Sequence, residues 1–302
     1  EEAMSRNRGR WTLWLGLADA RAWMVPDLCL EGRIADGLAA SESALQALDR
    51  AAEVGAEAAE IDGIRARMLL THAYALRTAG RDEAPALRTA LECARRAAAA
   101  GTDLADADLA LGQVLRLLAE SRSTASAEIE PLLLEAGAAL ARCLSRDPNH
   151  FGARSERSRV ELTLYRLFPL DPQAPDRYAR GMADLDASIQ AHPQQPLGWL
   201  YRAEALLVHA ENRFLLGLDA AADIEGAARD LDQVRALGRG DWTEYLARRA
   251  NLEIVLARRT EGSGEEKHRH LETAERHARA VLALLPHDSA ARTCLAQAIS
   301  FQ

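Results

Sequence analysis

Residues 196–234 read PLGWLYRAEALLVHAENRFLLGLDAAADIEGAARDLDQV, and their spacing predicts two packed helices. In the second half, Ala227 is followed four positions later by Leu231 and three positions after that by Val234. This spacing places the small residue and the two apolar residues on one face of a helix. In the first half, Ala203 is a second small residue, which allows another helix backbone to approach closely.

The same pattern recurs along the whole chain with a period close to 46 residues. A first series of small residues, which we assign to the first helix of each pair, comprises Ala20, Ala66, Gly112, Ser158, Ala203, Ala250 and Ala296. A second series, which we assign to the second helix, comprises Ala44, Ala90, Ala136, Gly181, Ala227 and Ala274. Two interleaved series with one period indicate an internal repeat, and all of these residues are predicted to pack where helices cross.

This pattern resembles the tetratricopeptide repeat (TPR), whose second helix carries Ala, a bulky residue, a small residue and then Pro. Pro148, Pro193 and Pro286 follow three of the second helices, and Trp199 matches the Trp of the family's first helix. The departure lies inside each repeat, where the two small residues are 23 or 24 positions apart, about twice the family's spacing. The excess must lengthen the helices, the loop between them, or both.

The resemblance implies an all-α fold, a right-handed α-solenoid of about six TPR-like helix-turn-helix repeats. We predict one domain over residues 1–302, with repeats at about 11–55, 56–101, 102–148, 149–193, 194–238 and 239–286 and a final helix at 289–302. The expected loops inside the repeats are Pro26–Gly37, Ala79–Pro85, Ser121–Ile129, Pro169–Asp176, Gly217–Asp223 and Thr260–Lys267.

Composition supports the helical prediction. Ala contributes 62 residues and Leu 46, whereas Ile and Val contribute 8 each. Strand-forming residues are therefore scarce, which excludes a β-sandwich or barrel and disfavours a parallel sheet. The formal charge of −8 argues against nucleic acid as a partner, because binding to phosphates requires a basic face. No stretch is long and apolar enough to predict a membrane span.

The chain shows none of the usual catalytic motifs. It lacks a phosphate-binding loop with its Lys, a G-x-S-x-G nucleophile turn, an H-E-x-x-H pair and the protein-kinase motifs. The four cysteines are far apart, which favours reduced thiols in a cytoplasmic protein. One cluster, His268, His270 and His277 with Glu266 and Glu272, has metal-ligand residue types, but so acidic a stretch is more typical of a solvated helix face. We predict no enzyme activity in this segment, no metal site and no cofactor.

The candidate binding residues follow from the resemblance. In the TPR family the residue after the small position of the first helix points into the concave face, where peptides bind. Here these residues are Arg21, Arg67, Gln113, Arg159, Glu204, Asn251 and Gln297, all of them polar. We therefore expect a scaffold that binds a partner protein or peptide on its concave face, with Arg and Asn suited to a carboxylate or a peptide backbone.

Two alternatives remain open for the larger context. Long-looped repeats of this length resemble those found C-terminal to the catalytic domain in some bacterial serine/threonine kinases, which predicts a docking or regulatory region. They also resemble the helical sensor arm of large bacterial transcription regulators. The chain begins with Glu1 rather than Met, so we expect it to be a fragment.

A further set of arginines directly precedes the small residue of four first helices. They are Arg65, Arg157, Arg202 and Arg249. They could form a ladder of binding groups along the array or pair with acidic residues of the neighbouring repeat, and we favour the pairing.

Overall fold

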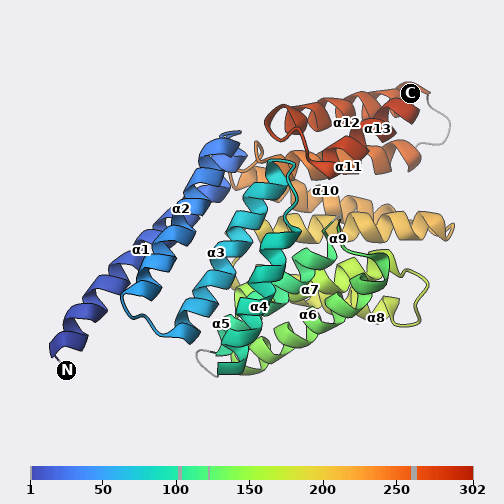
Figure 1. Ribbon diagram of the computed structural model, residues 1–302. Coiled ribbons are helices and arrows are strands. Elements are labelled where there is room, and N and C mark those ends of the chain that lie inside the picture. The colour runs from blue at the N-terminus through green and yellow to red at the C-terminus, as the bar shows by residue number, and fades with distance from the viewer. Residues whose placement is uncertain (1, 101–103, 122, 260–263, 302) are drawn as a thin grey trace. The chain divides into compact units, whose positions relative to one another are not determined.

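Thirteen α-helices form the regular structure in the part of the chain that the computed structural model describes, residues 2–100, 104–121, 123–259 and 264–301 (Figure 1). The helices are α1 Glu2–Leu30, α2 Ile34–Glu53, α3 Ala58–Thr78, α4 Ala84–Ala100, α5 Leu104–Ala119, α6 Ser126–Arg146, α7 Phe151–Leu167, α8 Ala174–Ala191, α9 Pro196–Leu215, α10 Ala221–Ala236, α11 Thr243–Arg259, α12 Gly264–Leu284 and α13 Ser289–Phe301. The predicted repeat boundary at residues 101 and 102, the predicted loop start Thr260 and the chain ends Glu1 and Gln302 lie outside these ranges.

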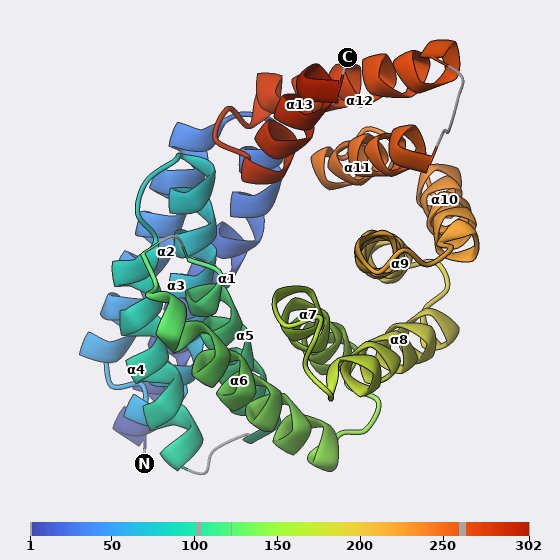
Figure 2. The same cartoon turned by 90° about the vertical axis from the view of Figure 1, so that its right-hand side faces the viewer.

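The chain divides into two compact units, residues 1–160 and 161–302, and the division falls inside α7. We call the odd-numbered helices first helices and the even-numbered ones second helices. In unit 1, α1 packs on α2, α3 on α4 and α5 on α6, while in unit 2 α9 packs on α10 and α11 on α12. First helices also contact one another, α1 with α3, α3 with α5, α9 with α11 and α11 with α13. Figure 2 shows α9 and α11 on the inner side of unit 2, with α8, α10 and α12 on the outer side.

The extra length of each repeat lies mainly in the helices. α3 ends at Thr78 and α4 begins at Ala84, and α9 ends at Leu215 while α10 begins at Ala221. The helices themselves reach 21 residues in α3 and 20 in α9. The short connections turn at Gly80 and Gly217, whose φ angles of 70° and 68° favour glycine.

The first predicted loop, Pro26–Gly37, is wrong at both ends. α1 continues through Pro26 to Leu30, and Gly37 lies inside α2. A proline inside a helix loses one backbone hydrogen bond. The helix nevertheless continues because Leu28 and Cys29, beyond the proline, are buried at 8% and 0% exposure. Gly37 permits this packing, since a Cβ there would lie 2.8 Å from the Cys29 sulfur.

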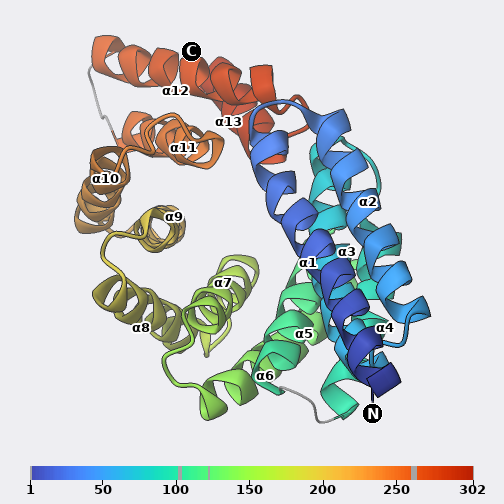
Figure 3. The same ribbon diagram turned by 90° about the vertical axis from the view of Figure 1, so that its left-hand side faces the viewer.

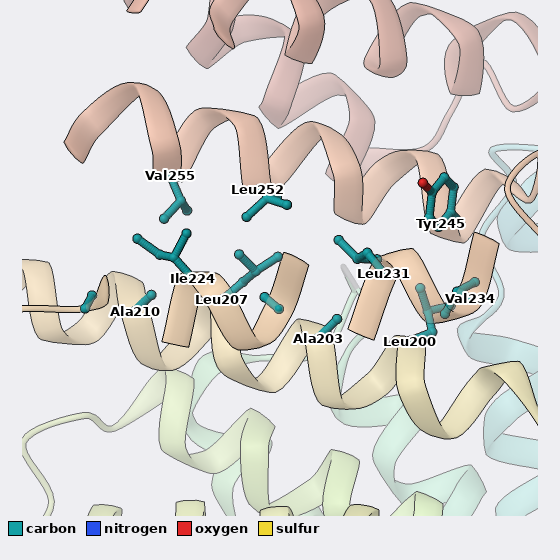
Figure 4. Packing of buried hydrophobic residues seen from close by; sticks show 12 residues of the cluster. Leu200, Ala203, Leu207, Ala210, Ile224, Leu231, Val234, Tyr245, Leu252 and Val255 are labelled. Atoms are coloured by element: carbon teal, nitrogen blue, oxygen red, sulfur yellow. The ribbon is translucent and has the colours of Figure 1, made fainter. Parts of the chain in front are cut away.

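The core of unit 2 shows how a helix pair is held together (Figure 4). Leu200, Ala203 and Leu207 of α9 meet Ile224, Leu231 and Val234 of α10 and Tyr245, Leu252 and Val255 of α11. Ala227, Leu231 and Val234 are each 0% exposed, so the four-then-three spacing lies on one buried face as predicted. Burying each such apolar side chain stabilises the fold by about 1.5–3 kcal/mol relative to an exposed one.

Most of the small residues lie at helix contacts. All six of the second series are buried, as are Ala66, Gly112, Ser158, Ala203 and Ala250 of the first. Gly112 of α5 is the tightest, because a Cβ there would lie 2.5 Å from the Leu140 Cγ of α6. The burial expected at Ala20 and Ala296 is not found, since both are exposed. Ala20 lies on α1 and Ala296 lies on α13. Within the described chain no helix pair precedes α1, and no second helix follows α13.

Candidate protein-interaction face

One polar residue follows the small position on every first helix, and we call these seven residues the polar column. They are Arg21 on α1, Arg67 on α3, Gln113 on α5, Arg159 on α7, Glu204 on α9, Asn251 on α11 and Gln297 on α13. None of them is fully buried, although both neighbours of the five interior members are buried, as with Ala250 and Leu252 around Asn251. The helical twist thus places each polar side chain at the edge of the helix contact.

The column members of unit 1 already contact other side chains. The Arg21 guanidinium donates to the Ser43 carbonyl oxygen at 3.2 Å and to the Ser43 hydroxyl. Arg67 lies 3.8 Å from the Asp19 carboxylate, and both side chains are about half exposed. Such an exposed pair contributes only about 0–1 kcal/mol, so the Arg67 guanidinium is readily available to a partner.

Next to the column, unit 1 contains a network of alternating charges that runs through α3, α5 and α7. The Arg116 side chain is only 2% exposed, and it lies 2.8 Å from Glu120 and 2.7 Å from Glu156. Arg159 continues the network, with its Nη1 3.4 Å from the Glu156 Oε1. At the other end Arg77 lies 3.0 Å from Glu83 and 4.0 Å from Glu120. The three guanidinium groups and three carboxylates balance one another, which satisfies charges that would otherwise be costly to bury.

This network lowers the pKa of its two central carboxyl groups. Burial by itself raises the pKa of Glu156, but the nearby Arg116 and Arg159 guanidinium groups outweigh it, and the net shift is downward. Glu120 behaves in the same way, with burial opposed by Arg116, Arg159 and Arg77. Both groups are therefore held ionised by their neighbours.

In unit 2 the column members Glu204 and Asn251 also contact neighbouring groups. The Arg248 guanidinium donates to the Glu204 Oε2 at 2.7 Å across α9 and α11. Asn251 hydrogen-bonds to Glu211 one helix away. Burial raises the pKa of Glu211, while Arg258, Arg166 and the Asn251 hydrogen bond only partly offset this effect. Glu211 is thus a half-buried carboxylate whose charge is incompletely compensated.

Three of the four arginines before the small positions pair with acidic residues of the preceding second helix. Arg65 of α3 lies 2.7 Å from Asp49 of α2, and Arg202 of α9 lies 2.8 Å from Asp186 of α8. In α11, Arg249 lies 3.9 Å from Asp232 of α10. These three contacts are sixteen or seventeen residues apart in sequence and link successive repeats. They favour the structural interpretation over a ladder of binding groups.

The structure also shows an aromatic cluster that the sequence did not suggest. The Tyr178 ring of α8 stacks on the His209 ring of α9, with centroids 4.1 Å apart and an interplanar angle of 14°. The Tyr165 ring lies 5.2 Å from Tyr178, and the His209 Nδ1 lies 3.0 Å from the Asp223 Oδ1. Burial raises the pKa of Tyr178 well above its usual value. No spacing or motif in the sequence indicates that these four residues come together.

Two histidines of the α12 cluster lie against carboxylate groups. His268 lies 3.2 Å from Glu272, and the His270 Nδ1 lies 2.6 Å from the Glu253 Oε2 of α11. Within the described ranges no group of three His, Cys, Asp or Glu side chains has the geometry to hold a metal ion.

The cysteine thiols Cys29, Cys93, Cys143 and Cys294 are buried and free of disulfides. Burial raises the pKa of both Cys143 and Cys294 to about 11, so these two thiols are protonated at neutral pH and unsuited to nucleophilic attack. Among the described helices, none combines the length and apolar character that crossing a membrane requires.

Comparison with known proteins gives similarity of fold alone. No family model matches the chain, and no curated protein is significantly similar to it in sequence. Among solved structures, the chain is similar to TTC0263, a thermophilic TPR protein of Thermus thermophilus, with a TM-score of 0.51 and 19% identity over 78% of this chain and 99% of that one. It is also similar to Nro1, a nuclear import adaptor of S. pombe, with a TM-score of 0.58 and 12% identity over 98% of this chain and all of the other. The predicted all-α, TPR-like helical-repeat fold is confirmed.

Proposed function

We propose that this chain is a non-catalytic scaffold that binds a partner protein or an extended peptide along the polar column. The observation that carries the proposal is that one polar, incompletely buried side chain recurs on every first helix between residues that pack the core. A repeat array leaves one face of the first helices uncovered, and repeat proteins use such faces for binding. The adaptor named among the similar folds is compatible with this function.

The chemistry of the column favours a polypeptide as the partner. Gln113, Asn251 and Gln297 carry amide groups that both donate and accept hydrogen bonds, which suits the backbone of an extended peptide. Arg67 adds an exposed guanidinium that can pair with a carboxylate of the partner. Nucleic acid is disfavoured because the chain carries a net charge of −8, and the charges of the unit 1 network balance one another.

Site-specific photo-crosslinking tests the proposal. A photoreactive amino acid would replace Gln113 in unit 1 and Gln297 in unit 2, and the matched controls would carry it at the exposed second-helix residues Glu92 and Glu225. We expect a common partner to be captured in the source cells from the two column positions and not from the controls. Equal capture from all four positions, or crosslinks from the controls alone, would contradict binding on the column.

The larger context of the chain is part of the same proposal. Two alternatives to a free cytoplasmic scaffold are a docking region attached to a bacterial serine/threonine kinase and the sensor arm of a bacterial transcription regulator, which the repeat length resembles. Sequencing the reading frame upstream of the Glu1 codon distinguishes these contexts. A Gly-rich loop, an H-R-D and a D-F-G in frame would identify the kinase, and a nearby start codon after a stop would identify the free adaptor.

A further inference from the structure

Two turns of unit 2 expose a group of large apolar side chains. Leu167 and Leu170 belong to the turn after α7, and Leu215, Leu216 and Leu218 belong to the turn after α9. We call these five residues the leucine tips. Leu170 is 83% exposed and Leu215 is 80% exposed, so both side chains project from the surface. Further helix pairs precede and follow both turns along the chain, so the leucine tips are not an uncovered end of the array.

The two turns lie at the same end of unit 2. The ring of Tyr165, just before Leu167, has its centroid 6.0 Å from that of His209, which lies less than two helical turns before Leu215. The Tyr178 ring of α8 also stacks on His209 and joins the bases of the two turns. In Figure 1 the turns after α7 and α9 and the last turn of α11 all lie at the right-hand end of unit 2, and this end faces the viewer in Figure 2. Figure 3 shows α9 and α11 side by side and strongly foreshortened, so both run along one direction.

The corresponding turns of unit 1 are polar. The turn between α3 and α4, residues 79–83, reads Ala-Gly-Arg-Asp-Glu. Between α5 and α6 the described residues include Ser121, Ser123 and Thr124. The leucine tips are therefore a feature of two particular turns and not of the repeat. Large exposed apolar patches on a folded protein mark interaction sites.

The exposed charges at this end of unit 2 are mainly positive. The last residues of α7, α9 and α11 together with the two turns contain four arginines and two aspartates, at 165–173, 212–220 and 257–259. Arg166, Arg258 and Arg259 are exposed. A chain whose net charge is −8 thus presents a locally cationic surface beside the leucine tips.

The two aspartates of the turns are bound within the chain. Asp171 lies 3.1 Å from the Arg177 guanidinium. Asp219 is exposed, but its carboxylate accepts a hydrogen bond from the Ala221 amide at 2.9 Å, at the start of α10. Both carboxylates are therefore directed toward their own helices.

The backbone of the turns is largely hydrogen-bonded within the chain. Leu216, Gly217 and Leu218 each donate an amide hydrogen to a carbonyl oxygen in the last turn of α9. In the turn after α7, Pro169 and Pro172 have no amide hydrogen to donate. A lipid environment offers no hydrogen-bond partners, so a segment that enters it must satisfy its backbone internally.

We propose that the leucine tips insert into the interfacial region of a membrane that contains anionic lipids. The leucine side chains leave water for the acyl chains, while the exposed arginines at the same end pair with lipid phosphate groups. A peptide or helix partner usually binds in a groove, whereas leucines that project from two separate turns suit a fluid surface that closes around them. The leucine tips include no residue of the polar column, so this inference does not rest on the proposed peptide binding.

Co-flotation of the whole chain with lipid vesicles tests the proposal. Vesicles of phosphatidylcholine are compared with an equal mixture of phosphatidylcholine and phosphatidylglycerol, and we expect tighter binding to the mixture. Leu170→Glu combined with Leu215→Glu should weaken this binding by at least about tenfold, because it removes two leucines from the lipid. Leu134→Glu is the matched control, since Leu134 is 51% exposed on α6 and lies outside the leucine tips. Circular dichroism checks that the variants remain folded.

A second pair of variants tests the contribution of the arginines. Arg259→Gln should weaken binding to the anionic vesicles by about fivefold and leave binding to phosphatidylcholine unchanged, because it removes one cation near the lipid surface. Arg88→Gln is the matched control, since Arg88 is also exposed but lies on α4 of unit 1. Equal losses from the two variants would contradict a cationic surface localised beside the leucine tips.

A fluorescent label tests insertion itself. Leu216→Cys carrying nitrobenzoxadiazole should shift its emission to shorter wavelength when anionic vesicles are added, and Leu134→Cys with the same label should not. The native cysteines are buried, which directs the label to the introduced thiol. An unaltered chain that floats with neither kind of vesicle, or flotation that survives the Leu170 and Leu215 substitutions, overturns the proposal. Failure to float combined with crosslinking from position 216 to a protein would assign the leucine tips to a protein partner instead.

Discussion

The Arg116 Nε donates to the Glu156 Oε2 over 2.7 Å, and this contact joins α5 to α7 inside unit 1. Arg116 is among the largest fully buried side chains of the described chain, so its charge depends on its two acidic neighbours. Removing one partner of such a pair leaves a buried charge uncompensated, which costs more than the intact pair contributes. The contact therefore links the two helices that carry the column residues Gln113 and Arg159.

Glu156→Gln should lower the free energy of unfolding by about 3 kcal/mol, since it removes the charge that balances Arg116. Glu135→Gln is the matched control, because Glu135 also accepts a hydrogen bond from an arginine forty residues away, Arg95 at 2.9 Å, but both side chains are about half exposed. The control should cost about 0–1 kcal/mol. Urea unfolding monitored by circular dichroism measures both values, and equal losses would argue against the importance of burial.

Unit 1 should lose stability in acid through Glu120 and Glu156. Burial opposes ionisation of both groups, but the arginines outweigh it and lower each pKa below the usual 4.5. A carboxyl group whose pKa is lower in the folded chain stabilises that chain above its unfolded pKa and loses this contribution as the pH falls through the folded pKa. Unfolding free energies measured from pH 7 down to pH 3 should therefore fall below about pH 4.5. Glu156→Gln should fall less steeply over the same range, and parallel curves would contradict this explanation.

Glu211 should show the opposite pH dependence. Its pKa is raised by burial, so the folded chain binds this proton more tightly than the unfolded chain does. Ionisation of Glu211 therefore costs stability as the pH rises from the unfolded pKa through the folded one. We expect Glu211→Gln to raise the melting temperature at pH 7 and to have little effect near pH 4, as measured by differential scanning calorimetry. A variant that is destabilised at pH 7 would indicate that the attraction of Arg258 and Arg166 outweighs the burial.

Gly112→Ala and Gly63→Ala should change stability in opposite directions, although both glycines lie inside first helices. A Cβ at position 112 would lie 2.5 Å from the Leu140 Cγ, so Leu140 must move and overpacking should cost about 1–3 kcal/mol. A Cβ at position 63 would meet only the Ala97 Cβ, at an ordinary 3.8 Å. There the higher helix propensity of alanine should add about 0.5–1 kcal/mol. Thermal unfolding of the two variants measures the difference, and a neutral Gly112→Ala would contradict the close approach of α5 and α6.

The helix pairs could be predicted from the sequence because the same local pattern of small and apolar residues recurs with a period close to 46 residues. Ala227, Leu231 and Val234 illustrate this, since their spacing alone defines a buried face. The same reasoning misplaced the end of α1, because it read Pro26 as a stop. Burial of the Leu28 and Cys29 side chains stabilises the helix by more than the lost hydrogen bond costs. That burial depends on α2 and α3 rather than on the local sequence.

The sequence by itself determined the helical class, the two series of small residues and the polar position that follows the first series, because all three depend on periodicity along one chain. Only the tertiary structure decided which polar side chains meet, as with Arg116 and Glu156, forty residues apart, or Asn251 and Glu211 on different helices. It also showed that the small residue Ala20 is uncovered, although its sequence pattern matches that of buried Ala66. The physical reason is that periodicity specifies which face of a helix can be packed, whereas the presence of a neighbouring helix decides whether it is.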